Sequence, residues 1–133
     1  MQKIILIEDD EILSKVLAEE LRDVGFEVAT AFDGEKGLEL TRSAHPDLVL
    51  LDLIMPKQNG FEVLKTLKKS PETKDIPVII LTVINADEDI MKGLQLGAQD
   101  FIIKSQHAVV EIVEKIKNFF SKEQHPGVRK LTV

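Results

Sequence analysis

Ile4-Ile5-Leu6-Ile7 is followed at once by Glu8-Asp9-Asp10-Glu11, so a short apolar run passes directly into four carboxylates. Four consecutive apolar residues, three of them β-branched, predict a strand buried on both faces, as in a parallel sheet. Over residues 11–24 the apolar residues recur with helical spacing, and Gly25 follows as a stop signal. The opening of the chain therefore predicts a strand–helix unit with carboxylates at the turn between the two elements.

The same alternation continues along the chain. Further strands are predicted at 26–31, 48–51, 78–81 and 100–103, and further helices at 35–43, 61–69, 87–96 and 109–120. Asp33 is the expected N-cap of the second helix. Five strand–helix units predict an α/β fold, with a doubly wound, five-stranded parallel sheet, right-handed crossovers and helices on both faces.

Length and composition limit the function classes. The chain has 133 residues, of which 44% are hydrophobic and 30% charged, so we expect one domain with a real core. Cysteine is absent, which excludes disulfides and thiol catalysis, and the three histidines are too widely spaced for a metal pair. The net charge of −6 argues against a broad nucleic-acid or membrane footprint. No apolar stretch approaches the roughly 20 residues of a membrane span, so we expect a soluble, cytoplasmic protein.

Polar residues follow the predicted strands. The carboxylates at 8–11 follow the first strand, Asp52 the third, Thr82 the fourth and Lys104 the fifth. Each alone has an ordinary explanation as a helix cap, a turn residue, a strand residue or a surface charge. The carboxyl ends of parallel strands nevertheless share one edge of a sheet, where ligands bind in folds of this class.

Together these residues predict a phosphoryl site. Three carboxylates in one place repel one another unless a cation lies among them, and all-oxygen ligands suit Mg²⁺. Lys104 adds a second cation, and the Thr82 hydroxyl can donate to an anionic oxygen. A carboxylate nucleophile, a divalent cation, an ammonium group and a hydroxyl are the groups needed to capture a phosphoryl group.

Five segments resemble the receiver domain of bacterial two-component response regulators. They are Ile-Ile-Leu-Ile-Glu-Asp-Asp-Glu at 4–11, Pro-Asp-Leu-Val-Leu-Leu-Asp-Leu-Ile-Met-Pro at 46–56, Asn-Gly at 59–60, Ile-Leu-Thr at 80–82 and Gly-Ala-Gln-Asp-Phe-Ile-Ile-Lys at 97–104. The resemblance covers about residues 2–121, and the second and last segments are its most specific part. It implies the flavodoxin-like (βα)5 three-layer sandwich of the chemotaxis regulators, with strand order 2-1-3-4-5.

The resemblance implies a role for each matching residue. Asp52 would be the phosphoacceptor, attacking a phosphohistidine on a sensor histidine kinase or a histidine phosphotransfer protein. Asp9 and Asp52 would bind Mg²⁺ directly, the main-chain carbonyl of Ile54 would be a further ligand, and Glu8 would act through a water. Lys104 would pair with the phosphoryl group.

The resemblance also implies a switch. Thr82 would turn toward the phosphoryl oxygen, and Phe101 would rotate into the space that Thr82 leaves. The face formed by residues 87–120 would then change partners, either an unknown downstream protein or a second copy in a phosphorylation-dependent homodimer. Such a chain is not an enzyme in the usual sense, because it only promotes its own phosphorylation and dephosphorylation. No direct contact with nucleic acid or membrane is expected.

Several positions depart from the family pattern. Most receivers have Pro after the Lys, with a cis bond between them, whereas this chain has Ser105, which leaves the loop cis or trans. Val83 replaces a usually small residue and narrows the access to Asp52. Ile54 and Ile84 occupy two positions that tune loss of the phosphoryl group, and neither can orient a water, so slow autodephosphorylation is expected.

Other readings of the sequence stay open. The chain could be a receiver fold that is not phosphorylated, or an N-terminal receiver cut from a longer DNA-binding or other output protein. A small α/β enzyme is a weaker alternative, because the chain has no Asp-x-Asp nucleophile loop, no Gly-x-Gly-x-x-Gly and no Walker loop. The helical pattern stops after Phe120, so we expect a receiver domain at 1–121 and a flexible tail, linker stub or docking peptide at 122–133.

Overall fold

Five parallel strands form one sheet, in the order β2-β1-β3-β6-β7, in the computed structural model, which describes residues 1–56 and 58–123. The strands are β1 (Lys3–Ile7), β2 (Glu27–Ala31), β3 (Leu48–Leu51), β6 (Val78–Thr82) and β7 (Asp100–Ile103). Counted along the chain, the order of this sheet is 2-1-3-4-5. The predicted fold class and strand order are therefore confirmed.

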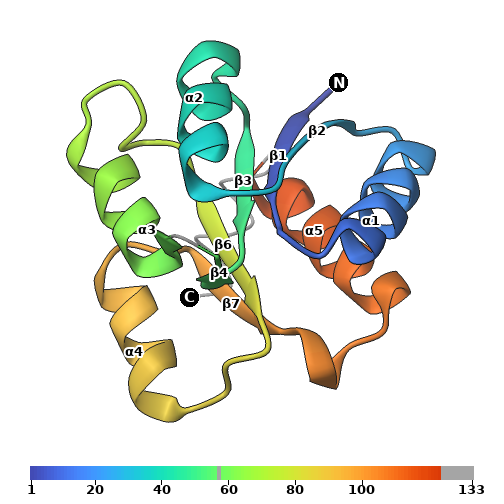
Figure 1. The fold of residues 1–133 in the computed structure, drawn as a ribbon. Coiled ribbons are helices and arrows are strands. Elements are labelled where there is room, and N and C mark those ends of the chain that lie inside the picture. The colour runs from blue at the N-terminus through green and yellow to red at the C-terminus, as the bar shows by residue number, and fades with distance from the viewer. Residues whose placement is uncertain (57, 124–133) are drawn as a thin grey trace.

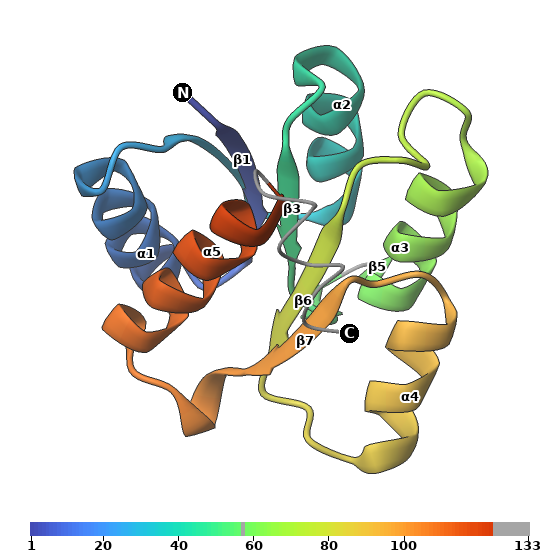
Figure 2. The same ribbon diagram turned by 180° about the vertical axis from the view of Figure 1, so that it is seen from behind.

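Helices cover both faces of the sheet. They are α1 (Glu11–Asp23), α2 (Gly34–Ala44), α3 (Gly60–Lys69), α4 (Asp87–Gln95) and α5 (Val109–Glu123). Figure 1 shows α2, α3 and α4 on one side of the sheet and α1 and α5 on the other, and the view from behind in Figure 2 shows the same three layers. The predicted N-cap is confirmed, since the Asp33 carboxylate accepts the Lys36 N–H at 2.8 Å.

Alternate residues of β1 face the two helix layers, which explains its uninterrupted apolar sequence. Ile4 and Leu6 belong to the core cluster beneath α1 and α5, and Ile5 and Ile7 belong to the cluster beneath α2 and α3. All four are at most 1% exposed. Each such side chain stabilises the fold by about 1.5–3 kcal/mol relative to an exposed one, so β1 anchors both cores.

Three details differ from the predicted pattern or complete it. A short antiparallel pair, β4 (Ile54–Met55) with β5 (Gln58–Asn59), lies in the predicted loop after β3. The last helix continues three residues past Phe120, to Glu123. No cis peptide bond occurs among the described residues, so the Lys104–Ser105 bond is trans, and it opens a 3-10 turn, η1 (Lys104–Gln106).

Two further observations concern the limits of the chain and its helices. Residues 124–133, most of the segment expected to be a tail, lie outside the described residues, so the boundary at 121 stays a prediction. Within the described ranges, none of the helices combines the length and the apolar character needed to cross a membrane.

Candidate functional site

The site lies where the carboxyl ends of four parallel strands meet, at the lower end of the sheet in Figure 1. Glu8 and Asp9 follow β1, Asp52 follows β3, Thr82 ends β6 and Lys104 follows β7. Carboxylate oxygens of Glu8, Asp9 and Asp52 all lie within 4.8 Å of one another. The sheet therefore brings together three carboxylates that come from two turns far apart in the sequence.

Asp52 is held at both carboxylate oxygens. Its Oδ1 accepts the main-chain N–H of Ile54 at 3.1 Å, and its Oδ2 accepts a hydrogen bond from the Lys104 ammonium group at 3.0 Å. Its own N–H donates to the Ile7 carbonyl at 3.0 Å, which continues the sheet ladder. The side chain is 4% exposed, so a buried carboxylate stands in one fixed orientation at the edge of the sheet.

Lys104 is the internal counter-ion of the cluster. Its ammonium group forms ion pairs with both Glu8 and Asp52, and its side chain is only 14% exposed. Burial by itself lowers the pKa of Lys104, but the hydrogen bond to Glu8 and the charge of Asp52 outweigh it, and the net pKa is raised. Lys104 therefore stays protonated in the absence of any bound cation.

Glu8 is a buried carboxylate whose charged form the site disfavours. Burial, and to a smaller extent the negative charge of Asp52, raise its pKa to about 7, against the lowering effect of the Lys104 hydrogen bond. Its Oε2 also accepts the N–H of Asp10 at 3.1 Å, while the Asp10 side chain caps α1 through the N–H groups of Ile12 and Leu13. Asp10 thus serves the helix, and Glu8 and Asp9 face the site.

The cluster suits a divalent cation. Glu8, Asp9 and Asp52 offer only oxygen atoms, and one lysine leaves their combined charge uncompensated, a set that favours a hard ion. The structure brings these three predicted ligands together. Ile54 contacts Asp52 through its main-chain N–H. That its main-chain carbonyl binds the metal stays a prediction.

Thr82 and Phe101 occupy neighbouring strands. Thr82 is fully buried, and its hydroxyl has no hydrogen-bond partner among residues 1–56 and 58–123. Thr82 is in register with Ile103, one residue before Lys104. Phe101 is half-buried on β7, where its ring lies 3.4 Å from the position that a Cβ on Gly93 of α4 would occupy. A buried hydroxyl without a partner at the end of β6 provides a donor for an added anionic oxygen.

Gly60 is a site-supporting residue that the sequence analysis treated only as part of a turn. A Cβ at this position would lie 2.5 Å from the main-chain oxygen of Asp52 and 2.5 Å from the Cα of Leu53. Asn59 caps α3 by accepting the Phe61 N–H at 2.8 Å. The Asn-Gly pair was the available signal, but the close approach to Asp52 depends on the fold.

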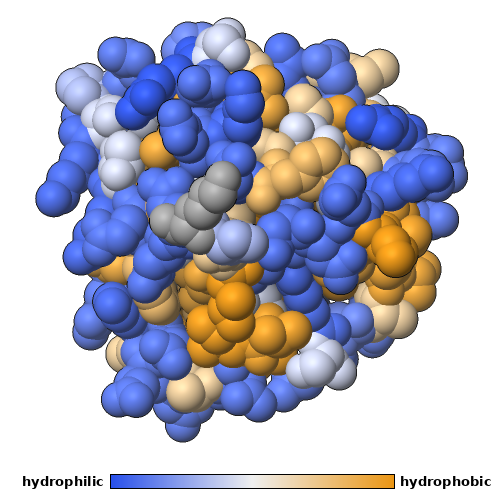
Figure 3. Space-filling view, viewed as in Figure 1, coloured by the Kyte–Doolittle hydropathy of each residue, from blue (hydrophilic) through white to orange (hydrophobic). Residues whose placement is uncertain are grey.

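The rim of the site is apolar. Ile54 is 51% exposed and Val83 is 53% exposed, and an apolar patch covers the region of β4 in Figure 3. Ile54 and Ile84 also line a hollow of about 580 Å³ between the β4–β5 pair and α4. Neither Ile54 nor Ile84 offers a side-chain hydrogen bond to water.

Comparisons with known proteins agree with this geometry. A family model described as the response regulator receiver domain matches residues 4–117. The probable transcriptional regulator ycf27 of Cyanophora paradoxa is 38% identical over 126 residues, which are 94% of this chain and 51% of that protein. The transcriptional regulatory protein CpxR of Escherichia coli is 44% identical over 104 residues, 78% of this chain and 43% of that protein. The chain thus spans about half the length of the curated relatives that it matches.

Solved structures show the same fold. The receiver domain of the Francisella response regulator 1452 superposes with a TM-score of 0.83 at 25% identity, over 92% of this chain and 99% of that chain. The phosphorylated cyanobacterial phytochrome response regulator RcpA gives a TM-score of 0.78 at 34% identity, over 89% and 92% of the two chains. The resemblance inferred from five motifs is confirmed along nearly the whole chain, and the chain belongs to the receiver domain family of two-component response regulators.

Proposed function

We propose that Asp52 accepts a phosphoryl group from a phosphohistidine of a sensor histidine kinase or histidine phosphotransfer protein. The observation that carries the proposal is the buried carboxylate of Asp52 held between the Ile54 N–H and the Lys104 ammonium group, beside two further carboxylates. A carboxylate oxygen of Asp52 forms the new P–O bond, the P–N bond breaks, and the imidazole nitrogen keeps its electron pair. Lys104 then pairs with the added negative charge.

Mg²⁺ is the cation that the donor set fits best. Asp9 and Asp52 would bind it directly, the Ile54 carbonyl would add a ligand, and Glu8 would act through a water. When bound, the ion offsets the charge of the incoming phosphoryl group. Without it, Lys104 is paired with Glu8 and Asp52, which places an ammonium group where the phosphoryl oxygens are expected.

Phosphorylation is proposed to act through Thr82 and Phe101. The Thr82 hydroxyl, which has no partner among the described residues, gains an acceptor only when the phosphoryl group is present. A contact available in one state and not in the other biases a two-state equilibrium toward the state that makes it. As Thr82 turns toward the site, Phe101 moves into the vacated space, and the surface formed by α4, β7 and α5 changes shape. That surface would engage an unknown downstream protein or a second copy of the chain.

We infer that the phosphorylated form is long-lived. The side chains of Ile54 and Ile84 line the hollow beside β4 and cannot orient an attacking water. The exposed Val83, next to Thr82, would narrow the access to Asp52. The test is decay of the phosphorylated form after labelling by a small phosphodonor, which we expect to take minutes or longer. Ile54→Asn, which supplies an amide at this position, should shorten the lifetime, and a wild-type half-life of seconds would contradict the inference.

The acceptor itself is tested by Asp52→Asn. Labelling with acetyl phosphate and Mg²⁺, followed by intact-protein mass spectrometry, should be lost in this variant because the amide is not a nucleophile. Asp100→Asn is the matched control, since Asp100 is exposed at the start of β7 and its side chain, among the described residues, bonds only to the N–H of Phe101. Full labelling of the Asp52→Asn protein would move the acceptor elsewhere, and no labelling of wild type would favour a plain interaction module.

The last proposal concerns the protein as a whole and what this receiver domain is part of. The curated relatives carry names of transcriptional regulators, and the chain covers only 51% and 43% of two of them. We propose a cytoplasmic receiver that acts either through its own α4–β7–α5 surface or as the N-terminal part of a longer output protein. The length of the full gene distinguishes the two arrangements.

A further inference from the structure

The free edge of β2 is the starting point of a second functional surface. Among the residues that the structure describes, β2 pairs only with β1. At the two ends of this ladder the Glu27 N–H donates to the Gln2 carbonyl and the Ala31 carbonyl accepts the Glu8 N–H, each at 2.9 Å. In a parallel ladder, every second residue of an edge strand directs its N–H and C=O away from the neighbour. In β2 these outward residues are Val28 and Thr30.

The protein covers only part of this edge. The guanidinium group of Arg22 donates to the Val28 carbonyl at 2.9 Å. Thr30, by contrast, has no hydrogen-bond partner for its N–H or its C=O within residues 1–56 and 58–123. Open edge groups of this kind are a template for pairing with another extended chain. Thr30 therefore offers one donor and one acceptor at the spacing that a strand requires.

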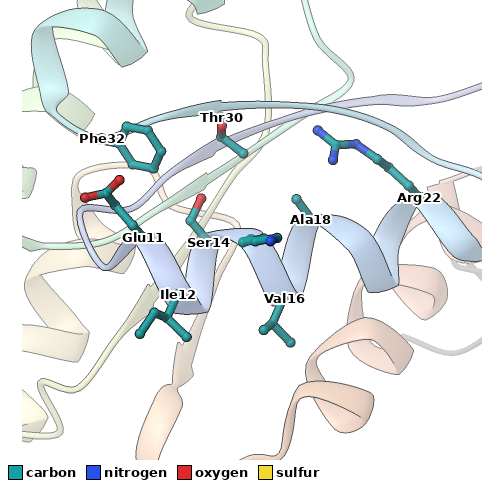
Figure 4. Close-up of a pocket in the computed structure, with 9 residues that line it drawn as sticks. Glu11, Ile12, Ser14, Val16, Ala18, Arg22, Thr30 and Phe32 are labelled. Atoms are coloured by element: carbon teal, nitrogen blue, oxygen red, sulfur yellow. The ribbon is translucent and has the colours of Figure 1, made fainter.

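Two hollows lie on either side of the open edge, and Thr30 and Phe32 line both of them. The first, about 620 Å³, lies between α1 and β2, and Figure 4 shows Ser14 and Ala18 extending from α1 toward the strand that carries Thr30. The Ser14 hydroxyl is 1% exposed and has no partner among the described residues. The second hollow, about 670 Å³, lies beside α2 and includes Leu40. A strand laid along the edge would place alternate side chains in the two hollows.

We propose that the free edge of β2, from Val28 to Phe32, binds an extended segment of a partner protein as a sixth strand of the sheet. The segment pairs with the N–H and C=O of Thr30, so it carries no proline at the pairing position. The side chain that faces α1 is small and polar, and it shares a hydrogen bond with the Ser14 hydroxyl.

Charge sets the chemistry of one end of the segment. At the carboxyl end of β2, Glu11 lines the hollow beside α1 and Asp33 lines the hollow beside α2. Lys15 and Lys36 line the same hollows one helical turn further along α1 and α2, and Arg22 lies toward the other end of β2, at Val28. Asp10 precedes Glu11 in the same turn. The end of the bound segment that lies beside Phe32 therefore carries Lys or Arg, and Phe32, which is 47% exposed, packs on its aliphatic stem.

The surface is independent of the proposed switch. β2 and β7 form opposite edges of the five-stranded sheet, and the proposed output surface includes β7. A sixth strand on β2 leaves α4, β7 and α5 uncovered, so the chain can hold one partner while its phosphorylation state selects another. Binding at the β2 edge is expected to be the same with and without a phosphoryl group on Asp52.

The experiment uses the full chain and two synthetic peptides, acetyl-Lys-Thr-Val-Thr-Val-Thr-amide and acetyl-Thr-Val-Thr-Val-Thr-Lys-amide, which place the cation at either end. NMR titration should shift the amide signals of residues 28–32, and amide exchange at Thr30 should slow by about tenfold at saturation. Thr30→Pro removes the outward N–H on an edge strand that tolerates proline, and should weaken binding by about tenfold. Thr30→Val keeps the N–H and should bind like wild type.

Peptides methylated on the backbone nitrogens of the pairing residues serve as a control that does not depend on the folding of any variant. They keep every side chain and should not bind. Absence of shifts at residues 28–32 with both unmodified peptides, or equal binding by the methylated peptides, overturns the proposal. Protection of Thr30 in the peptide-free protein that is lost on dilution assigns the edge to a second copy, and protection that is lost on removing residues 124–133 assigns it to the chain itself. Either result also overturns the partner assignment.

Discussion

Glu8→Gln removes one buried charge from the site while it keeps the shape of the side chain and its ability to accept a hydrogen bond from Lys104. Glu8 is 1% exposed, and burial raises its pKa from 4.5 to about 7, with a further contribution from the charge of Asp52 and opposition from Lys104. Between these two values the folded state binds a proton that the unfolded state has released. The fold is therefore destabilised as Glu8 ionises.

The sign and size of this change in unfolding free energy follow from proton linkage. A carboxyl group whose pKa is raised by folding favours the folded state below its unfolded pKa, and that contribution is lost as the pH rises through the folded pKa. At about 1.4 kcal/mol per pKa unit, ionised Glu8 destabilises the fold by about 3 kcal/mol above pH 7. We expect Glu8→Gln to equal wild type in unfolding free energy near pH 4.5 and to exceed it by about 2–3 kcal/mol at pH 8 in a chelator.

Urea unfolding across this pH range, with EDTA or with MgCl₂, measures the effect. Added Mg²⁺ should stabilise wild type more than the variant, because the variant has lost one of the carboxylates that attract the cation. Glu114→Gln is the control, since the Glu114 side chain is 59% exposed and forms a surface ion pair with the exposed Lys117. Loss of its charge should change stability by less than about 0.5 kcal/mol. Parallel pH profiles for wild type and Glu8→Gln, or a variant less stable than wild type at pH 8 in the chelator, would refute the reasoning.

Three further substitutions test the site. Thr82→Val removes a buried hydroxyl without a partner among the described residues, so it should raise the free energy of unfolding by about 1 kcal/mol in thermal denaturation. Thr73→Val is the comparison: that hydroxyl donates to the Leu67 carbonyl at 2.7 Å, so its loss should lower the free energy of unfolding by a similar amount. Gly60→Ala places a methyl group against the Asp52 carbonyl and should lower stability by about 2 kcal/mol and slow acetyl phosphate labelling, as measured by denaturant unfolding and mass spectrometry. Lys104→Met leaves the buried carboxylates unpaired, so it should destabilise the metal-free protein by about 3 kcal/mol in the same unfolding assay, and Mg²⁺ should recover much of that loss.

Most of the fold could be predicted because strong local signals agree with it. The apolar strands, the Gly and Pro punctuation and the helical spacing placed every element boundary within one residue of the structure, apart from the end of the last helix. That end was placed at Phe120 because residues 121–123 add a polar turn without apolar spacing. The β4–β5 pair was missed because strands of two residues show no periodicity.

The site was predictable as a set of residue types but not as a set of contacts. The position of each polar residue after a strand, together with the family resemblance, indicated which side chains meet. The sequence could not show that Lys104 bonds Asp52 at one oxygen while the Ile54 N–H holds the other. It also could not show that Gly60 lies against the Asp52 carbonyl, because that approach depends on how α3 enters from the β4–β5 pair.

The phosphoryl site and the proposed β2 surface share one feature, a buried hydroxyl without a hydrogen-bond partner among the described residues. Thr41 and Thr73 each donate to a main-chain carbonyl at 2.7 Å, as buried polar groups ordinarily do. Ser14 and Thr82 are as deeply buried, and neither has a partner within the described ranges. An unsatisfied buried hydroxyl lowers stability, and a partner that arrives in another state of the protein would remove that cost. For Thr82 we propose that this partner is the phosphoryl oxygen on Asp52, and for Ser14 that it is a side chain of the strand that pairs with β2. An unpartnered buried hydroxyl thus occurs both at the phosphoryl site, on β6, and at the proposed binding surface beside β2, and these two strands lie on opposite sides of β1 in the sheet.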